Sequence, residues 1–111
     1  METTITQPLM MNLTQIQLDR LSLRQFCVKY GIGRLSLFGS ILREDFGPGS
    51  DVDFLVEFLP GRVPGLLGLA AMELELTGMV GRKADLRTVK ELSQYFRQTV
   101  LAEAVVQYGE D

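Results

Sequence analysis

Two aspartates separated by a single residue, Asp51 and Asp53, have the spacing in this sequence that most clearly permits chemistry. Apolar side chains alternate along residues 51–58, which predicts a β-strand with one face in the core. Residues two apart in a strand share a face, so the two carboxylates would lie close together. Their charges repel, and a bound divalent cation would relieve that repulsion. Taken alone, however, Asp-x-Asp beside Gly and Ser is more typical of a solvated turn.

A second feature is Gly39-Ser40, which follows the short β-like run at residues 35–38. A strand that ends in Gly and Ser before a helical turn exposes backbone N–H groups that can cradle a phosphate. Gly39 would let the phosphate approach closely, and the Ser40 hydroxyl could donate to it. The alternative is that Ser40 only caps a short helix.

The rest of the chain predicts the elements that position these residues. The capping-box pattern at Ser22–Gln25 predicts a helix with Ser22 as its N-cap, ending at Gly31, although apolar spacing also allows a start near Thr14. Further along we expect a helical turn over 41–45, a helix with an apolar stripe, a strand over 83–88 that carries Asp85, and a helix from 89 to 108. The stripe consists of Leu66, Leu69, Met72, Leu76 and Met79. In the strand over 51–58, the residues expected to face the core are Val52, Phe54, Val56 and Phe58.

This order of elements predicts an α/β (α+β) fold, a small mixed β-sheet flanked by helices. The chain has 111 residues, enough for one domain, and we place an N-terminal tail at 1–13 and the domain at 14–111. There is no histidine and only one cysteine, so acid–base and metal chemistry must come chiefly from carboxylates, which favour Mg²⁺ or Mn²⁺.

Composition also narrows the setting. The net charge is −3 and no basic stripe is visible, so we expect no direct nucleic-acid partner. The N-terminus lacks the pattern of a signal peptide, and no apolar run approaches the ~20 residues that span a bilayer. A cytoplasmic protein with no membrane partner is the expectation.

Taken together, the motifs resemble a known family. Gly39-Ser40, ten intervening residues and then Asp51-Val52-Asp53 is similar to the signature of nucleotidyltransferases related to DNA polymerase beta. The wider context resembles the minimal nucleotidyltransferases, antitoxin partners of HEPN-type ribonuclease toxins. That context comprises residues 37–40, Arg43, residues 50–53 and residues 55–58, and the resemblance extends from about residue 21 to residue 108.

The resemblance implies the nucleotidyltransferase fold and a role for each matching residue. Gly39 and Ser40 would hold the β- and γ-phosphates of ATP. Asp51 and Asp53 would bind Mg²⁺, with two ions the expected number. Asp85 would complete the metal site and accept the proton of the attacking hydroxyl.

Three further residues, Arg43, Glu44 and Glu57, need a separate interpretation. Arg43 matches an Arg that could contact phosphate, or it could be a surface residue paired with Glu44 or Asp45. The family usually has Gly where Glu44 stands, and an extra negative charge there could weaken nucleotide binding. Glu57 shares the carboxylate face but lies too far along the strand to reach the metal, so we expect it to be structural.

The implied function is that of an Mg²⁺-dependent adenylyltransferase antitoxin. It would transfer one or several AMP groups from ATP to a tyrosine hydroxyl of a HEPN toxin, with which it would form a hetero-oligomer. One alternative is neutralisation of the toxin by binding alone, through the Leu66–Met79 stripe or the C-terminal helix. Another is a small-molecule nucleotidyltransferase, although those enzymes usually carry an added helical domain.

Overall fold

The computed structural model describes residue 16 and residues 18–109 of the chain. Thr14 and the expected boundary between tail and domain lie outside these residues. The helices are α2 (Arg20–Tyr30), the 3₁₀ helix η1 (Gly39–Leu42), α3 (Leu66–Val80), the 3₁₀ helix η2 (Val89–Glu91) and α4 (Arg97–Glu103). The strands are β1 (Ile32–Phe38), β2 (Val52–Phe58), β3 (Ala84–Arg87) and β4 (Val105–Tyr108). In this part of the chain no helix has the length and apolar character needed to cross a membrane.

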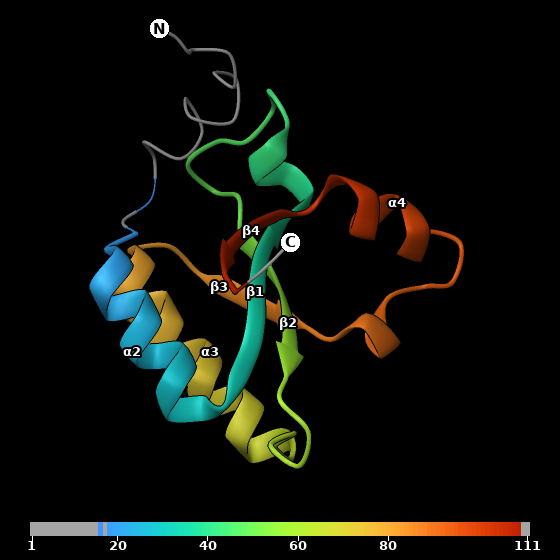
Figure 1. Cartoon of the computed structure of the whole chain (residues 1–111). Helices are drawn as coiled ribbons and strands as arrows, with labels where there is room; N and C mark the ends of the chain where they lie inside the picture. The colour runs from blue at the N-terminus through green and yellow to red at the C-terminus, as the bar shows by residue number, and fades with distance from the viewer. Residues whose placement is uncertain (1–15, 17, 110–111) are drawn as a thin grey trace, which may run out of the picture.

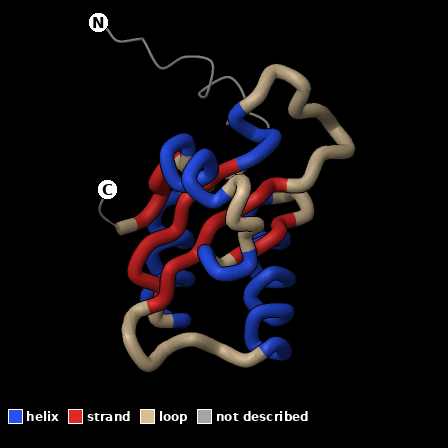
Figure 2. The backbone as a smooth tube through the Cα atoms, turned by 90° about the vertical axis from the view of Figure 1, so that its right-hand side faces the viewer, coloured by secondary structure: helices blue, strands red, loops and turns tan. Residues whose placement is uncertain are grey.

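The four strands form one mixed sheet in the order β3-β2-β1-β4. β1 pairs antiparallel with both β2 and β4, whereas β2 and β3 are parallel and are joined through α3. Helices α2 and α3 lie side by side against one face of the sheet, and α4 lies on the other side (Figure 1). The turned view in Figure 2 shows the same layers, so the mixed sheet flanked by helices is confirmed.

The hydrophobic core lies between the sheet and the pair α2 and α3. Alternate residues of the strands point into it, and one stripe of each helix completes it, as expected where a sheet buries one face. Full burial of a large apolar side chain contributes about 1.5–3 kcal/mol to folding, so this layer supplies most of the driving force. The buried residues include Leu23, Phe26, Leu35, Leu37, Val52, Phe54, Val56, Met72, Leu76 and Val80.

Helix α3 also fixes the edge strand β3, which carries Asp85. The outward-facing backbone N–H of Leu86 donates to the Glu73 carboxylate at 2.8 Å, and the N–H of Ala84 donates to the Thr77 hydroxyl at 2.9 Å. Both acceptors lie on α3, so side chains of the helix take the place of a further strand. The position of β3 therefore depends on polar contacts as well as on apolar packing.

The predicted N-cap of the first helix is wrong. Asp19 is the N-cap of α2, and its carboxylate accepts hydrogen bonds from the Ser22 N–H at 3.0 Å and the Ser22 hydroxyl at 2.6 Å. Ser22 therefore lies inside the first turn. Gly31 does end the helix, at φ 70°, as predicted. Strand β1 begins at Ile32, earlier than the predicted run over 35–38, and η1 spans 39–42 in place of the turn over 41–45.

The helix predicted over residues 89–108 is also wrong. A capping box between Thr88 and Glu91 starts only the short η2, α4 ends at Glu103, and the chain then extends into β4. Val105, Val106 and Tyr108 favour extended backbone, and pairing with β1 provides backbone partners for it. The sheet thus has a fourth strand that the apolar spacing did not reveal.

The apolar stripe of α3 is confirmed only in part. Met72 and Leu76 are buried together with Val80, but Leu66 in the first turn of α3 is 84% exposed. Likewise Leu55, expected on the open face of β2, is buried, so that face is covered as well at this point.

Glu73 offers a test of how α3 supports β3. Glu73→Ala removes the acceptor for the Leu86 N–H, so we expect a loss of about 1–3 kcal/mol in the free energy of unfolding, the cost of an unsatisfied, partly buried donor. Glu73→Gln keeps a carbonyl oxygen and should lose much less. Urea unfolding of both variants measures this, and equal losses would contradict the assigned contact.

Candidate active site

The strand register brings two of the three predicted carboxylates together. Asp53 on β2 is paired with Phe38 on β1 and, on its other side, with Asp85 on β3. Neighbouring strands are about 4.8 Å apart, and paired residues point to the same face. The carboxylates of Asp53 and Asp85 therefore lie next to each other on the sheet face opposite α2 and α3.

Gly39, which directly follows Phe38, is required by this arrangement. Its φ is +79°, in the left-handed region, and a Cβ on it would collide with the Asp53 carboxylate oxygen Oδ2. Both observations disfavour a side chain at this position, which would be strained and would displace the Asp53 carboxylate. The glycine thus allows the chain that leaves β1 to pass directly over the Asp53 carboxylate.

The surroundings of Asp53 disfavour its charge. Partial burial raises the pKa of Asp53 to about 6, and the nearby negative charges of Asp85 and Asp51 act in the same direction. The positive charges of Arg87 and Arg43 oppose this increase without cancelling it. The site therefore carries an excess of negative charge around a half-buried carboxylate.

Asp85 and Asp51 each have a basic partner on or next to β3. The Arg87 guanidinium donates to Asp85 Oδ2 at 3.1 and 3.3 Å, and Asp85 in turn raises the pKa of Arg87. Asp51 is more exposed, and its carboxylate lies 3.8 Å from the Lys83 ammonium. Exposed ion pairs of this kind contribute little and exchange readily, so neither carboxylate is committed to its partner.

No three His, Cys, Asp or Glu side chains of the described residues are grouped so that they could together hold a metal ion. The pair Asp53 and Asp85 fits a hard divalent cation by its chemistry, because carboxylate oxygens are its preferred ligands and the cation would relieve the repulsion that acts on Asp53. Asp51 is near enough for its charge to act on Asp53, but it is not among the residues that line the cavity. The three-carboxylate metal site stays a prediction.

Of the other residues considered in the sequence, Ser40 and Arg43 lie near this pair, whereas Ser50 lies in the preceding loop and Glu57 lies at the far end of β2. The Ser40 hydroxyl donates to the backbone carbonyl of Asp51 at 3.5 Å, while Arg43 lines the same cavity as Asp53. The Ser50 hydroxyl accepts from the Gly47 N–H at 3.1 Å, in keeping with a turn. Glu57 accepts two hydrogen bonds from Arg34, at 2.6 and 2.8 Å, which agrees with a structural role.

A cavity of about 400 Å³ opens over the carboxylates. One wall carries Gly39, Asp53 and Asp85, and the opposite wall comes from η2, α4 and the residues between them. That second wall is mixed: Leu92, Phe96 and Val100 give it an apolar part, beside the polar Glu91, Ser93, Thr99 and Glu103. No local pattern in the sequence marks these residues as part of the site, although the position of Arg87, two residues after Asp85 on a predicted strand, places it on the same face. The lining residues that were missed include Phe38, Arg87, Leu92, Phe96, Thr99 and Val100.

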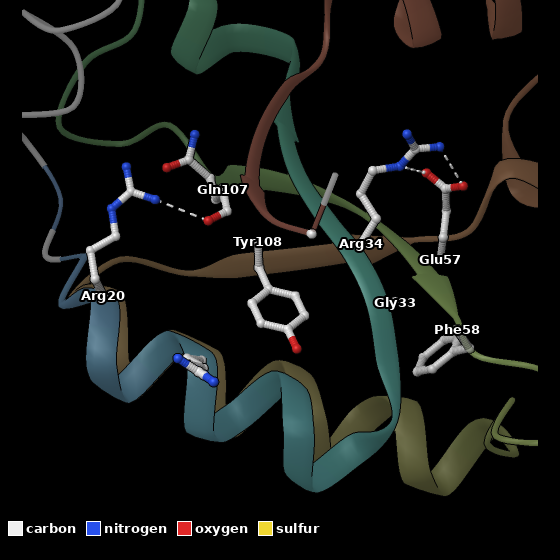
Figure 3. A pocket seen from close by; sticks show the side chains of 9 residues that line it. Arg20, Gly33, Arg34, Glu57, Phe58, Gln107 and Tyr108 are labelled. Carbon is white, nitrogen blue, oxygen red and sulfur yellow. Dashed lines mark hydrogen bonds and ion pairs between the residues drawn. The ribbon is translucent and has the colours of Figure 1, made fainter. Parts of the chain in front are cut away.

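A larger cavity, of about 870 Å³, lies at the other end of β1 and β2 (Figure 3). There Arg20 donates to the backbone carbonyl of Gln107 at 2.9 Å, and Arg34 pairs with Glu57. The lining contains none of the predicted site residues. The acidic cavity is therefore the candidate active site, although it is the smaller of the two.

Comparison with known proteins agrees with this choice. Residues 20–106 match the model of the nucleotidyltransferase domain. The chain belongs to the nucleotidyltransferase domain family. It is 36% identical over 78 residues to the provisionally named protein adenylyltransferase MJ0435 of Methanocaldococcus jannaschii, covering 70% of this chain and 82% of that protein. It is 34% identical over 77 residues to the protein adenylyltransferase MntA of Thermococcus cleftensis, covering 69% and 76%. The chain is thus a nucleotidyltransferase, as predicted.

Solved structures give the same result. A provisionally assigned minimal nucleotidyltransferase has a TM-score of 0.63 and 35% identity, over 78% of this chain and 86% of that one. This confirms both the fold and the resemblance to the minimal nucleotidyltransferases. A toxin–antitoxin structure with AMP-PNP has a TM-score of 0.67 at 17% identity, over 85% and 76% of the two chains. At that identity the likeness shows the fold alone.

The raised pKa of Asp53 makes stability depend on pH in a defined direction. The folded protein holds this proton up to about pH 6, while the unfolded chain releases it near the ordinary value of 3.8. The contribution to stability is therefore complete below pH 3.8 and is lost as the pH rises through about 6. Asp53→Asn removes that loss.

We expect Asp53→Asn to raise the free energy of unfolding of the metal-free protein at pH 7.5 by roughly 1–2 kcal/mol, discounted for solvent screening of a half-buried group. The gain should disappear toward pH 4. Denaturant unfolding across this pH range measures it, with the exposed Asp45→Asn as control. A gain that is the same at both pH values would contradict the electrostatic account.

Proposed function

We propose that this nucleotidyltransferase is a protein adenylyltransferase antitoxin, which transfers AMP from ATP to a tyrosine hydroxyl of a HEPN-type toxin with which it forms a hetero-oligomer. The observation that carries the proposal is the register of β1, β2 and β3, which places Gly39, Asp53 and Asp85 around one cavity in a chain of this family.

The names of related proteins support a protein as the acceptor and ATP as the nucleotide. Two proteins that are 34–36% identical to the chain carry the name protein adenylyltransferase. Solved structures with the same fold are described as the toxin–antitoxin pair MntA–HepT, and another as a toxin–antitoxin structure with the ATP analogue AMP-PNP. We infer that this chain likewise acts on a protein acceptor, binds a toxin partner and uses ATP.

In the proposed reaction the tyrosine oxygen attacks the α-phosphorus of ATP. A new O–P bond forms, the bond from the α-phosphorus to the bridging oxygen breaks, and pyrophosphate leaves with the electron pair. Asp85 accepts the proton of the hydroxyl, for which its position at the cavity is suitable. Arg43, on the same lining, contributes positive charge toward the triphosphate.

Mg²⁺ would be held by Asp53, Asp85 and Asp51, and two ions are expected. When bound, these ions would neutralise charge on the triphosphate and on the leaving group. The protein itself then has to position the reactants and exclude water. Gly39 leaves the approach to Asp53 open, because it carries no side chain against that carboxylate. This division of labour explains how a chain without histidine acts as an enzyme.

The direct test is to incubate the purified protein with ATP, Mg²⁺ and the product of the neighbouring gene, and to measure the mass of that product. We expect a gain of one or more AMP groups. Asp53→Ala should lower the rate at least ~100-fold, because a group that stabilises developing charge is lost. The exposed Asp45→Asn should leave it unchanged. Equal transfer by Asp53→Ala, or no transfer by the wild type, would contradict the proposal.

A second candidate function is neutralisation by binding alone, and one observation favours it. The outer face of α3 carries Leu66, Leu67 and Leu74, which are 84%, 88% and 76% exposed. Exposed apolar side chains gathered on one helix are typical of a protein interface. Binding and catalysis could therefore both contribute to the effect on the toxin.

The double variant Asp51→Asn, Asp53→Asn separates the two functions. It keeps side-chain size and leaves α3 unchanged, so binding to the partner should persist while transfer is lost. If catalysis is required, cells that produce the toxin will no longer be protected, as measured by growth. Protection equal to that of the wild type would show that binding suffices.

A further inference from the structure

Arg82 contributes to the structure of the site without lining its cavity. It follows Gly81, the C-cap of α3, and precedes β3. Its guanidinium Nη2 donates to the backbone carbonyls of Gly47 and Ser50, the latter at 3.0 Å. The guanidinium also lies over the ring of the buried Phe46, 4.7 Å from the ring centroid. One partly buried cation thus joins the end of α3 to the loop that precedes Asp51.

The rest of that loop is held by the buried side chain of Phe46 and by hydrogen bonds within the turn. Gly47 and Ser50 form a turn, in which the Ser50 N–H donates to the Gly47 carbonyl at 3.0 Å. Arg82 binds both carbonyls of this turn from outside, and a charged donor makes such hydrogen bonds stronger than neutral ones. Asp51 directly follows Ser50, so the position of the turn determines where Asp51 begins.

The residue after Arg82 completes the arrangement. The Lys83 carbonyl accepts from the Val52 N–H at 2.8 Å, immediately beyond Asp51. Asp51 is therefore bracketed, with its preceding peptide held by Arg82 and its following peptide held by the backbone of Lys83. The side chain of Asp51, in contrast, is exposed, and among the described residues its ion pair is the one with Lys83 at 3.8 Å. Its position depends on its backbone.

We infer that Arg82 is a positioning residue for nucleotidyl transfer: it holds the turn at 47–50 so that Asp51 can join Asp53 at the metal and triphosphate. This inference rests on the proposed function of the same site. Arg82 is not among the cavity-lining residues, and its hydrogen bonds go to Gly47 and Ser50, so it acts through the loop. Residues that orient a metal ligand typically affect metal affinity or activity 10–100-fold.

The test uses the full chain and measures, by calorimetry, the Mg²⁺-dependent affinity for AMP-PNP, together with the free energy of unfolding of the metal-free protein. We expect Arg82→Met to weaken AMP-PNP binding in Mg²⁺ roughly 10- to 100-fold. Arg82→Lys should lie between this variant and the wild type, because an ammonium keeps the charge over Phe46 and reaches one carbonyl. It also serves as the reporter if Arg82→Met fails to fold.

Two comparisons separate positioning from general support of the fold. Arg62→Met is the matched control, because Arg62 also donates to a backbone carbonyl, that of Lys29, but away from the site. It should leave binding unchanged. In an Asp51→Asn background, Arg82→Met should change affinity by less than ~2-fold, since partners that act through one group are not additive.

The outcomes are distinct. Lower stability with unchanged AMP-PNP affinity in both Arg82 variants would overturn the inference, as would a full additional loss in the Asp51→Asn background. If the wild type itself does not bind AMP-PNP in Mg²⁺, the proposed function fails, and the inference fails with it.

Discussion

The candidate site depends on one constraint: the strand register forces the carboxylates of Asp53 and Asp85 into proximity, at the position where Asp53 also pairs with Phe38. Strand pairing places Asp53 and Asp85 side by side, and the chain leaving β1 covers Asp53 so closely that a side chain at position 39 would displace its carboxylate. Such an arrangement is unfavourable in isolation, as the raised pKa of Asp53 shows. It is maintained because the strands that carry it are fixed by a core on their other face. The core supplies the free energy that allows a strained electrostatic arrangement to persist.

The two faces of the sheet therefore differ in chemical character and in role. The face toward α2 and α3 is apolar and holds the strands in register. The opposite face carries the acidic groups at one end and, at the other, the Arg34–Glu57 pair. Residues around η2 and α4 cover the acidic end and give the cavity a wall of different character. One cavity thus presents both charged and apolar side chains to a ligand.

The parts of the site that depend on local sequence patterns could be predicted from the sequence. Alternation along β2 placed Asp51 and Asp53, and the resemblance to a family supplied Asp85. The patterns failed where the local structure is decided by contacts between residues that are distant in the sequence. Asp19 and Ser22 are both good N-caps, and only the fold shows which of them is used. The helical spacing of Leu92, Phe96 and Val100 continued into residues that pair with β1 instead. Arg82 has no sequence signature, because its partners are backbone carbonyls more than thirty residues earlier.

Side chains occupy hydrogen-bonding groups along both outer strands of the sheet. On β3, Glu73 and Thr77 accept from the outward N–H groups, and on β4, Arg20 and Gln107 donate to the carbonyls of Gln107 and Val105. A foreign strand would have to displace these contacts before it could extend the sheet. Growth by edge-to-edge aggregation is thereby disfavoured, and so is recognition by β-augmentation. Helix faces and the rim of the cavity are thus more accessible to another molecule than the edges of the sheet.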